Sequence, residues 1–152
     1  MTDLRLHGQQ ISDITPLAAL TDLERLDLSY NQISDLTPLS NLASLEVLEL
    51  EDNQITDIQP LSQLTRLRTL GLANNQIVDI TPLSTLVNLE ILILGLNQII
   101  DIQPLAELTQ LQHLNLGGNQ VVDIQPLAPL VRGCLKSRSC SNKSSQGVCC
   151  DK

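Results

Sequence analysis

The 152-residue chain has no phenylalanine and no tryptophan, and Tyr30 is its only aromatic residue. Any buried core must therefore be filled by leucine and isoleucine. Residues 1–130 also lack lysine and hold only four arginines against 16 acidic residues, which gives this part a net charge of −12. Because nucleic-acid binding needs clustered cations that contact phosphates, we expect no nucleic-acid partner.

Long apolar runs and targeting segments are missing as well. No run reaches the ~18 apolar residues that a membrane helix needs, so we expect no membrane partner. The opening MTDLRLHGQQ has no basic segment followed by an apolar stretch, so no signal peptide is visible. As written, the sequence predicts a cytoplasmic protein. A secreted or surface location applies if the chain is a fragment of a longer one.

What the chain does contain is a repeat of 22 residues. The pattern LxxLxLxxNxI at this period is that of a leucine-rich repeat. One partial unit and about five complete units occupy residues 1–131, which we interpret as one domain. Three residue types mark the period: asparagine at Asn31, Asn53, Asn75, Asn97 and Asn119, aspartate at Asp13, Asp35, Asp57, Asp79, Asp101 and Asp123, and proline at Pro16, Pro38, Pro60, Pro82, Pro104 and Pro126.

Each part of the unit predicts a local structure. Residues 25–29 alternate polar and apolar, which indicates a short strand with Leu26 and Leu28 inside and Ser29 among the outward residues. The recurring asparagine can satisfy buried backbone groups where the chain leaves the sheet. An aspartate followed by Thr-Pro-Leu or Gln-Pro-Leu predicts a capped short turn. With 22 residues per unit we expect 3₁₀ or turn-like segments outside.

The step NQISDLTPLSNL, with its D-[IL]-[TQ]-P-L core, resembles the 22-residue repeats of the bacterial internalins. More loosely, it resembles the leucine-rich repeats of the eukaryotic phosphatase-1 regulator. The resemblance covers residues 1 to about 130. It implies a right-handed, curved repeat solenoid with a parallel sheet on its concave face and short 3₁₀ or turn segments on its convex face. Internalins bind host receptors through the concave sheet. This sequence shows neither their helical cap before the repeats nor their immunoglobulin-like domain after them, so the resemblance implies the scaffold alone.

Residues 132–152 break the pattern and form a basic tail rich in serine and cysteine. Every position that another repeat would require is wrong here. All four cysteines lie at or after Cys134, with the spacing C-x5-C-x8-C-C, which lacks the paired C-x2-C of zinc sites. We expect a flexible tail or a reading-frame artefact. A small disulfide-stapled cap and a zinc knuckle are the alternatives.

The outward strand positions change in character along the array. They are charged in the first repeats, neutral in the middle and apolar in the stretch NLEILILGLNQII at residues 88–100. There Ile91, Ile93, Leu96 and Ile100 occupy positions that are polar in the early repeats. Single exposed apolar residues are normal on any protein, but a group of them favours a contact surface.

An acidic group at Asp27, Glu49, Glu51 and Asp52 is the second candidate. It is either a solvated acidic face or the partner of a basic surface, and a Ca²⁺ site is a weak third reading. The two histidines, His7 and His113, lie five strands apart in this register, which excludes a shared metal site.

From this pattern we expect no enzyme, no cofactor and no metal site, but a module that binds a protein partner through the concave face. The alternative is a self-associating structural repeat, in which the partner is a second copy. The predicted contact residues are Arg25, Asp27, Val47, Glu49, Glu51, Thr69, Ile91, Ile93, Leu96, His113 and Asn115.

Overall fold

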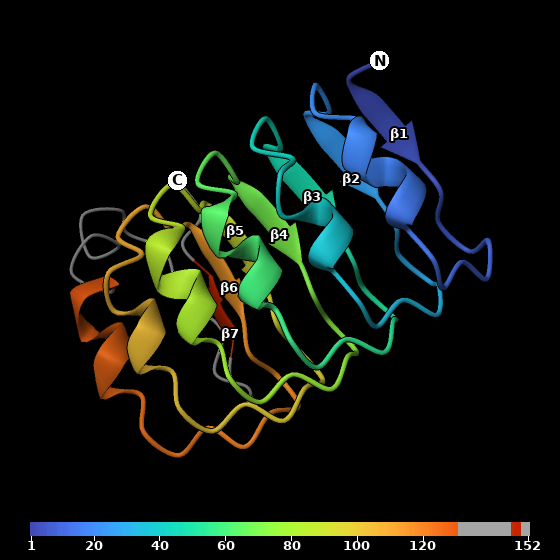
Figure 1. Cartoon of the computed structure of the whole chain (residues 1–152). Coiled ribbons are helices and arrows are strands. Elements are labelled where there is room, and N and C mark those ends of the chain that lie inside the picture. Colours follow the sequence, from blue (N-terminus) through green and yellow to red (C-terminus); the bar gives the residue numbers. More distant parts are fainter. Residues whose placement is uncertain (131–146, 150–152) are drawn as a thin grey trace.

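The computed structural model describes residues 1–130 and 147–149 as short strands alternating with 3₁₀ helices. Figure 1 shows the strands side by side in sequence order along the concave face, with the helices across the core from them. The elements are β1 (Asp3–Arg5), η1 (Thr15–Ala19), β2 (Arg25–Asp27), η2 (Thr37–Leu39), β3 (Val47–Glu49), η3 (Gln59–Gln63), β4 (Thr69–Gly71), η4 (Thr81–Thr85), β5 (Ile91–Ile93), η5 (Gln103–Leu105), β6 (His113–Asn115), η6 (Gln125–Leu127) and β7 (Gly147–Cys149).

Strands β1 to β6 form a parallel sheet in which each residue pairs with the residue 22 positions later. Leu26 pairs with Leu48, which pairs with Leu70. The middle residue of each strand is therefore a leucine that points into the core, and those of β2 to β5 are at most 1% exposed. The parallel solenoid predicted from the repeat is confirmed.

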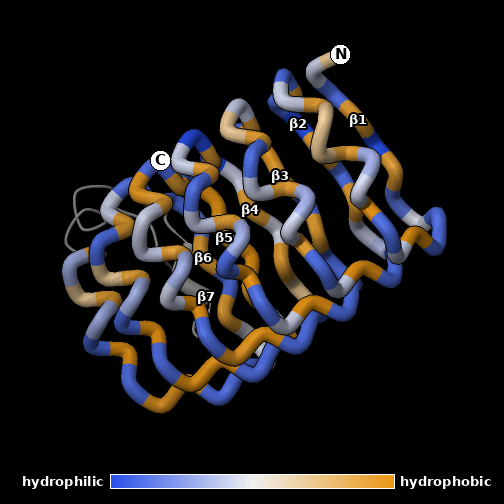
Figure 2. Tube along the Cα trace, in the orientation of Figure 1, coloured by the Kyte–Doolittle hydropathy of each residue, from blue (hydrophilic) through white to orange (hydrophobic). Residues whose placement is uncertain are grey.

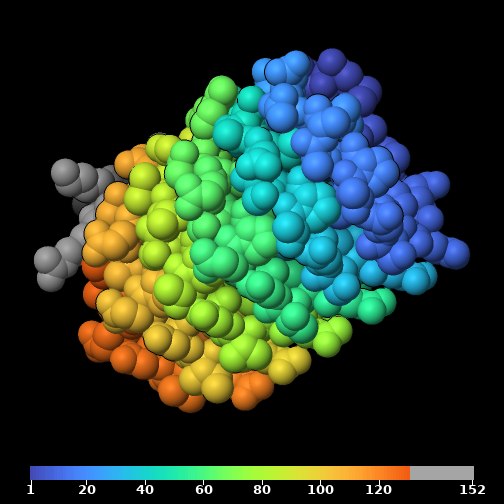
Figure 3. Space-filling model, in the orientation of Figure 1, coloured from blue at the N-terminus to red at the C-terminus, as the bar shows by residue number. Residues whose placement is uncertain are grey.

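The core is a stack of aliphatic side chains contributed in equal sets by the repeats. Leu45, Leu67 and Leu89, one from each of three successive repeats, are fully buried. Figure 2 shows apolar segments recurring at the same place in every turn of the chain. Figure 3 shows successive repeats as adjacent bands. Since each band contacts mainly its neighbours, stability is close to a sum of repeat and interface terms.

The outer segments are 3₁₀ helices of three to five residues, as the repeat length predicts. Each has proline in its first turn. The backbone N–H groups there have no acceptor within the helix, so the N–H that proline lacks costs no helical hydrogen bond. The preceding aspartate accepts a hydrogen bond from the backbone N–H two residues later, as from Thr15 to Asp13 at 2.8 Å. The pKa values of Asp13, Asp35 and Asp79 are lowered, because each accepts hydrogen bonds from the hydroxyl and backbone N–H of a following threonine.

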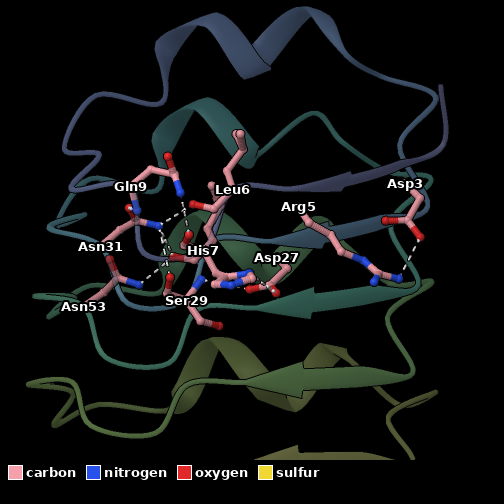
Figure 4. A network of polar contacts seen from close by, with 10 residues as sticks. Asp3, Arg5, Leu6, His7, Gln9, Asp27, Ser29, Asn31 and Asn53 are labelled. Carbon is pink, nitrogen blue, oxygen red and sulfur yellow. Dashed lines mark hydrogen bonds and ion pairs between the residues drawn. The ribbon is translucent and has the colours of Figure 1, made fainter.

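The asparagines form a buried ladder that joins neighbouring repeats. Asn53 Nδ2 donates to the carbonyl oxygens of Leu28 and Leu50 at 3.0 and 3.1 Å, and its Oδ1 accepts from the N–H of Ile33 at 2.9 Å. Asn31 does the same between the first two repeats, and Figure 4 shows both side chains in this network. The prediction that the asparagine supplies partners for buried backbone groups is confirmed.

The strands end earlier than the alternation predicts. They span three residues, yet repeats stay hydrogen-bonded beyond them, as between the N–H of Tyr30 and the carbonyl oxygen of Glu51 at 2.8 Å. Ser29, predicted to face outward, is in fact buried, with 6% exposure. Ser29 lines a hollow of the concave face together with His7 and Glu51.

One strand has no counterpart in the sequence pattern. β7 pairs antiparallel with β6, with Gly147 opposite Asn115 and Cys149 opposite His113. It adds a seventh strand to the sheet, in the direction opposite to the other six. Apart from Gly147–Cys149, residues 131–152 lie outside the part of the chain that the structure describes. The predictions that concern them are the domain boundary after residue 131, the flexible tail, the disulfide-stapled cap and the zinc knuckle.

Candidate functional site

The predicted contact residues lie in rows that run across the sheet. The first row contains Asp3, Arg25, Val47, Thr69, Ile91 and His113, and the second contains Arg5, Asp27, Glu49, Gly71, Ile93 and Asn115. Since neighbouring strands are ~4.8 Å apart, successive members of one row lie next to each other. The sequence register of both rows is thus confirmed, and the eleven predicted residues share one face and its edge.

Apolar exposure on this face centres on β5 and the turn after it. Ile91 is 39% exposed and Leu96 is 61% exposed, whereas Ile93 is only partly exposed. The two isoleucines flank the buried Leu92 on one strand, as the alternation requires. The apolar patch, meaning Ile91, Ile93 and Leu96, is therefore present, although Ile93 contributes less surface than its outward direction alone would suggest.

Leu96 occupies a strained backbone position. The row that follows the strands has positive φ at every repeat, with 59° at Tyr30, 53° at Asp52, 53° at Asn74 and 57° at Leu96. Glycine fills this position at Gly8 and Gly118. A residue with a Cβ in this region costs roughly 1–2 kcal/mol, and only glycine, with asparagine and aspartate occasionally, adopts it routinely. Leucine is therefore not favoured by the backbone conformation at this position. The polar and apolar alternation of the sequence does not reveal the positive φ.

The acidic group is centred on Glu49. Burial, first, and then the charges of Glu51 and Asp27 together raise the pKa of Glu49 to about 7. The carboxylate lies over Gly71 on β4, where a Cβ would overlap Glu49 Oε2. Glycine at this place thus leaves the space that the side chain fills.

The acidic residues border a hollow of about 370 Å³. Its lining consists of His7, Asp27, Ser29, Tyr30, Glu49 and Glu51. His7 Nδ1 lies 3.5 Å from Asp27 Oδ2, and Figure 4 shows His7, Asp27 and Ser29 together at this place. Of the predicted acidic group, Asp52 is not part of this lining; its carboxylate instead accepts a hydrogen bond from Asn74.

A second hollow, of about 400 Å³, contains none of the predicted residues. It is lined by Glu46, Arg66, Arg68, Asn88, Glu90 and Gln110, which precede the strands of their repeats. Arg66 pairs with Glu46 at 3.0 Å, and Arg68 Nε donates to Glu90 Oε1 at 2.9 Å. These charges satisfy one another, and exposed pairs of this kind contribute only ~0–1 kcal/mol. The sequence could have indicated these ion pairs, because charges of opposite sign alternate at 22-residue spacing in Glu46, Arg68 and Glu90.

Residues 1–130 and 147–149 contain no group of three or more histidine, cysteine, aspartate or glutamate side chains arranged to hold a metal ion. The same part of the chain contains no helix with the length and apolar character needed to span a bilayer.

Comparison with known proteins gives matches along nearly the whole array. The family model described as "Leucine Rich repeats (2 copies)" matches residues 1–41, 43–85 and 87–129, so each match takes in two repeats. No match was found among curated proteins.

Solved structures of bacterial proteins share the same fold. An internalin from Listeria monocytogenes is 45% identical over 80% of this chain, with a TM-score of 0.78. Internalin C2 from that organism is 41% identical over 86%, with a TM-score of 0.74. A leucine-rich-repeat protein from Leptospira interrogans is 29% identical over 86%, with a TM-score of 0.79. The chain covers 36%, 67% and 36% of these proteins respectively, so it is much shorter than two of them.

Proposed function

Because the chain belongs to the leucine-rich-repeat family, with repeats like those of the internalins, we propose that it is a non-catalytic module that holds a protein partner on its concave sheet face. Leucine-rich-repeat proteins generally mediate protein–protein interactions, and the outward side chains of this face differ from repeat to repeat. The inward strand position is leucine in every repeat, whereas the outward ones range from Asp27 to Ile93.

The observation that carries the proposal is the exposed apolar patch at Ile91, Ile93 and Leu96. Fully burying an aliphatic side chain contributes ~1.5–3 kcal/mol, which sets an upper limit of roughly 5–9 kcal/mol for three. Association itself costs ~4–15 kcal/mol. The patch alone is therefore marginal, and the polar residues beside it must contribute to any stable complex.

The proposal is tested by placing a charge in the patch. Ile93→Glu should remove partner binding, because a carboxylate buried at an interface without a counter-charge costs several kcal/mol. Ile93 is already partly exposed, so the fold should survive, and circular dichroism should be unchanged. If the variant unfolds, Ile93 belongs to the core. If it folds and binding is unaffected, the contact surface lies elsewhere.

Self-association is the second candidate, favoured by an apolar row outside the concave face. Val78, Ile100 and Val122 stand 22 residues apart and are 53%, 52% and 88% exposed. The same row holds Ser12, Ser34 and Thr56 in the first repeats. Light scattering on the purified chain at tens of micromolar separates the two candidates, since a monomer supports the binding module and a dimer or stack supports self-association.

A further inference from the structure

We propose that the partner presents an arginine or lysine beside an apolar side chain, with the basic group entering the hollow next to Glu49 and the apolar one lying on Ile91 and Ile93. This inference rests on the proposed function and adds the chemistry of the partner. It follows from the charge of the concave face, from the position of the Glu49 carboxylate over Gly71 and from the distance between two strands.

The carboxylates around the hollow have little positive charge of their own. Asp27 on β2, Glu49 on β3 and Glu51 after it face the same space. Three of the four arginines in residues 1–130 are engaged elsewhere, since Arg5 pairs with Asp3, Arg66 with Glu46 and Arg68 with Glu90. Burial is the main cause of the raised pKa of Glu49, and the charges of Glu51 and Asp27 add to it, which reflects this imbalance. A cation from outside would relieve it.

Gly71 connects the acidic hollow to the apolar patch. In the second row, Glu49, Gly71 and Ile93 are successive members, and the Glu49 carboxylate extends across the glycine. No side chain of β4 in this row separates the carboxylate from Ile93. A basic head group can therefore contact Glu49 while neighbouring aliphatic atoms cover Ile93.

The spacing limits the partner's geometry. Strands β3 and β5 are two steps apart in the sheet, which is about 10 Å. An extended peptide covers this distance in about three residues, at ~3.3 Å each. A helix covers it in about two turns. An extended segment with a basic residue and an apolar residue three positions later is the simplest ligand.

Binding of such a ligand depends on pH in a defined direction. Glu49 must be ionised to attract a cation, so affinity should rise as pH rises through about 7. The other titratable groups facing Glu49 are Asp27, Glu51, Tyr30 and His7, and β4 contributes only Gly71. We expect binding to be on the order of tenfold tighter at pH 8 than at pH 5.5.

The test uses short synthetic peptides and the full chain labelled with ¹⁵N. The first peptide has arginine and leucine three residues apart in a neutral Gly/Thr background. The others replace arginine by glutamine, arginine by glutamate, or leucine by serine. Chemical-shift titration up to millimolar peptide should move the amides of Glu49, Gly71 and Ile93 with the first peptide, and each replacement should weaken the effect.

Two variants of the chain sharpen the result. Glu49→Gln should lower the affinity for the arginine–leucine peptide about tenfold at pH 8. It should leave the weaker affinity at pH 5.5 unchanged. The control Glu107→Gln alters an exposed carboxylate at an outer turn. It should leave the affinity for the peptide unchanged at both pH values. Any of three results would overturn the inference. The glutamate peptide could bind as tightly as the arginine peptide, Glu49→Gln could leave the peptide affinity unchanged, or millimolar peptide could leave the amide chemical shifts unchanged. The proposed function would still stand if Ile93→Glu abolishes capture of a protein partner, and would fail separately if it does not.

Discussion

Replacing Glu49 by glutamine should stabilise the protein at high pH and have no effect at low pH. The substitution keeps the shape of the side chain and removes its charge. Glu49 is half-buried among other carboxylates, and its pKa is raised from the ordinary 4.5 to about 7. Between these two values the folded protein binds more protons than the unfolded chain does, so the free energy of unfolding falls as pH rises.

The magnitude follows from the size of the pKa change. A displacement from 4.5 to about 7 corresponds to at most ~3 kcal/mol. Because the Glu49 side chain is only partly buried, solvent screening reduces the expected effect to ~1 kcal/mol. The stability linked to Glu49 is fully present below pH 4.5 and is lost as pH rises through about 7. Glutamine has no such loss.

Urea unfolding at pH 4.5 and pH 8 measures the effect. Glu49→Gln should match the wild type at the lower pH and exceed it by ~1 kcal/mol at the higher one. Glu107→Gln is the matched control and should follow the wild type at both. A difference that is equal at the two pH values, or a less stable variant at pH 8, would refute the placement of Glu49 in an uncompensated acidic site.

Two further predictions concern single residues of the array. Asn75→Ala should lower the free energy of unfolding by roughly 1–3 kcal/mol in urea melts, because the N–H of Ile55 and the carbonyl oxygens of Leu50 and Leu72 lose their buried partner; a neutral result would mean that the asparagine ladder is exposed to water. Gly71→Ala should move the Glu49 carboxylate towards solvent and shift its pKa back towards 4.5, as NMR titration would report; an unchanged titration midpoint would contradict the position of that carboxylate over Gly71.

The sequence predicts most of the fold because one period determines several features at once. The 22-residue spacing fixes which residues pair between strands, so the rows from Arg25 to His113 follow from counting. Period-two alternation then divides inward from outward residues, and Pro16 with Asp13 places a short capped turn outside. These features are local or strictly periodic, and they need no knowledge of side-chain conformation.

The features that the sequence missed depend on neighbours that counting does not reveal. The alternation places Ser29 on the outward side but does not show that this side chain is buried. The left-handed backbone at Leu96 is a property of the turn, and a leucine gives no sign of it. The position of Glu49 over Gly71 depends on a rotamer that crosses between repeats. The candidate site was therefore predictable as a list of residues on one face, but its hollow and its electrostatics were not.

The central claim, that the concave face holds a protein partner, is tested most directly by affinity capture with quantitative mass spectrometry on matched variants. Wild-type chain, Ile93→Glu on the concave face and Val78→Glu on the outer apolar row should be compared after circular dichroism has shown that all three are folded. We predict that proteins retained by the wild type are retained equally by Val78→Glu and lost with Ile93→Glu. Retention of the same proteins by Ile93→Glu, or their loss only with Val78→Glu, would contradict the claim.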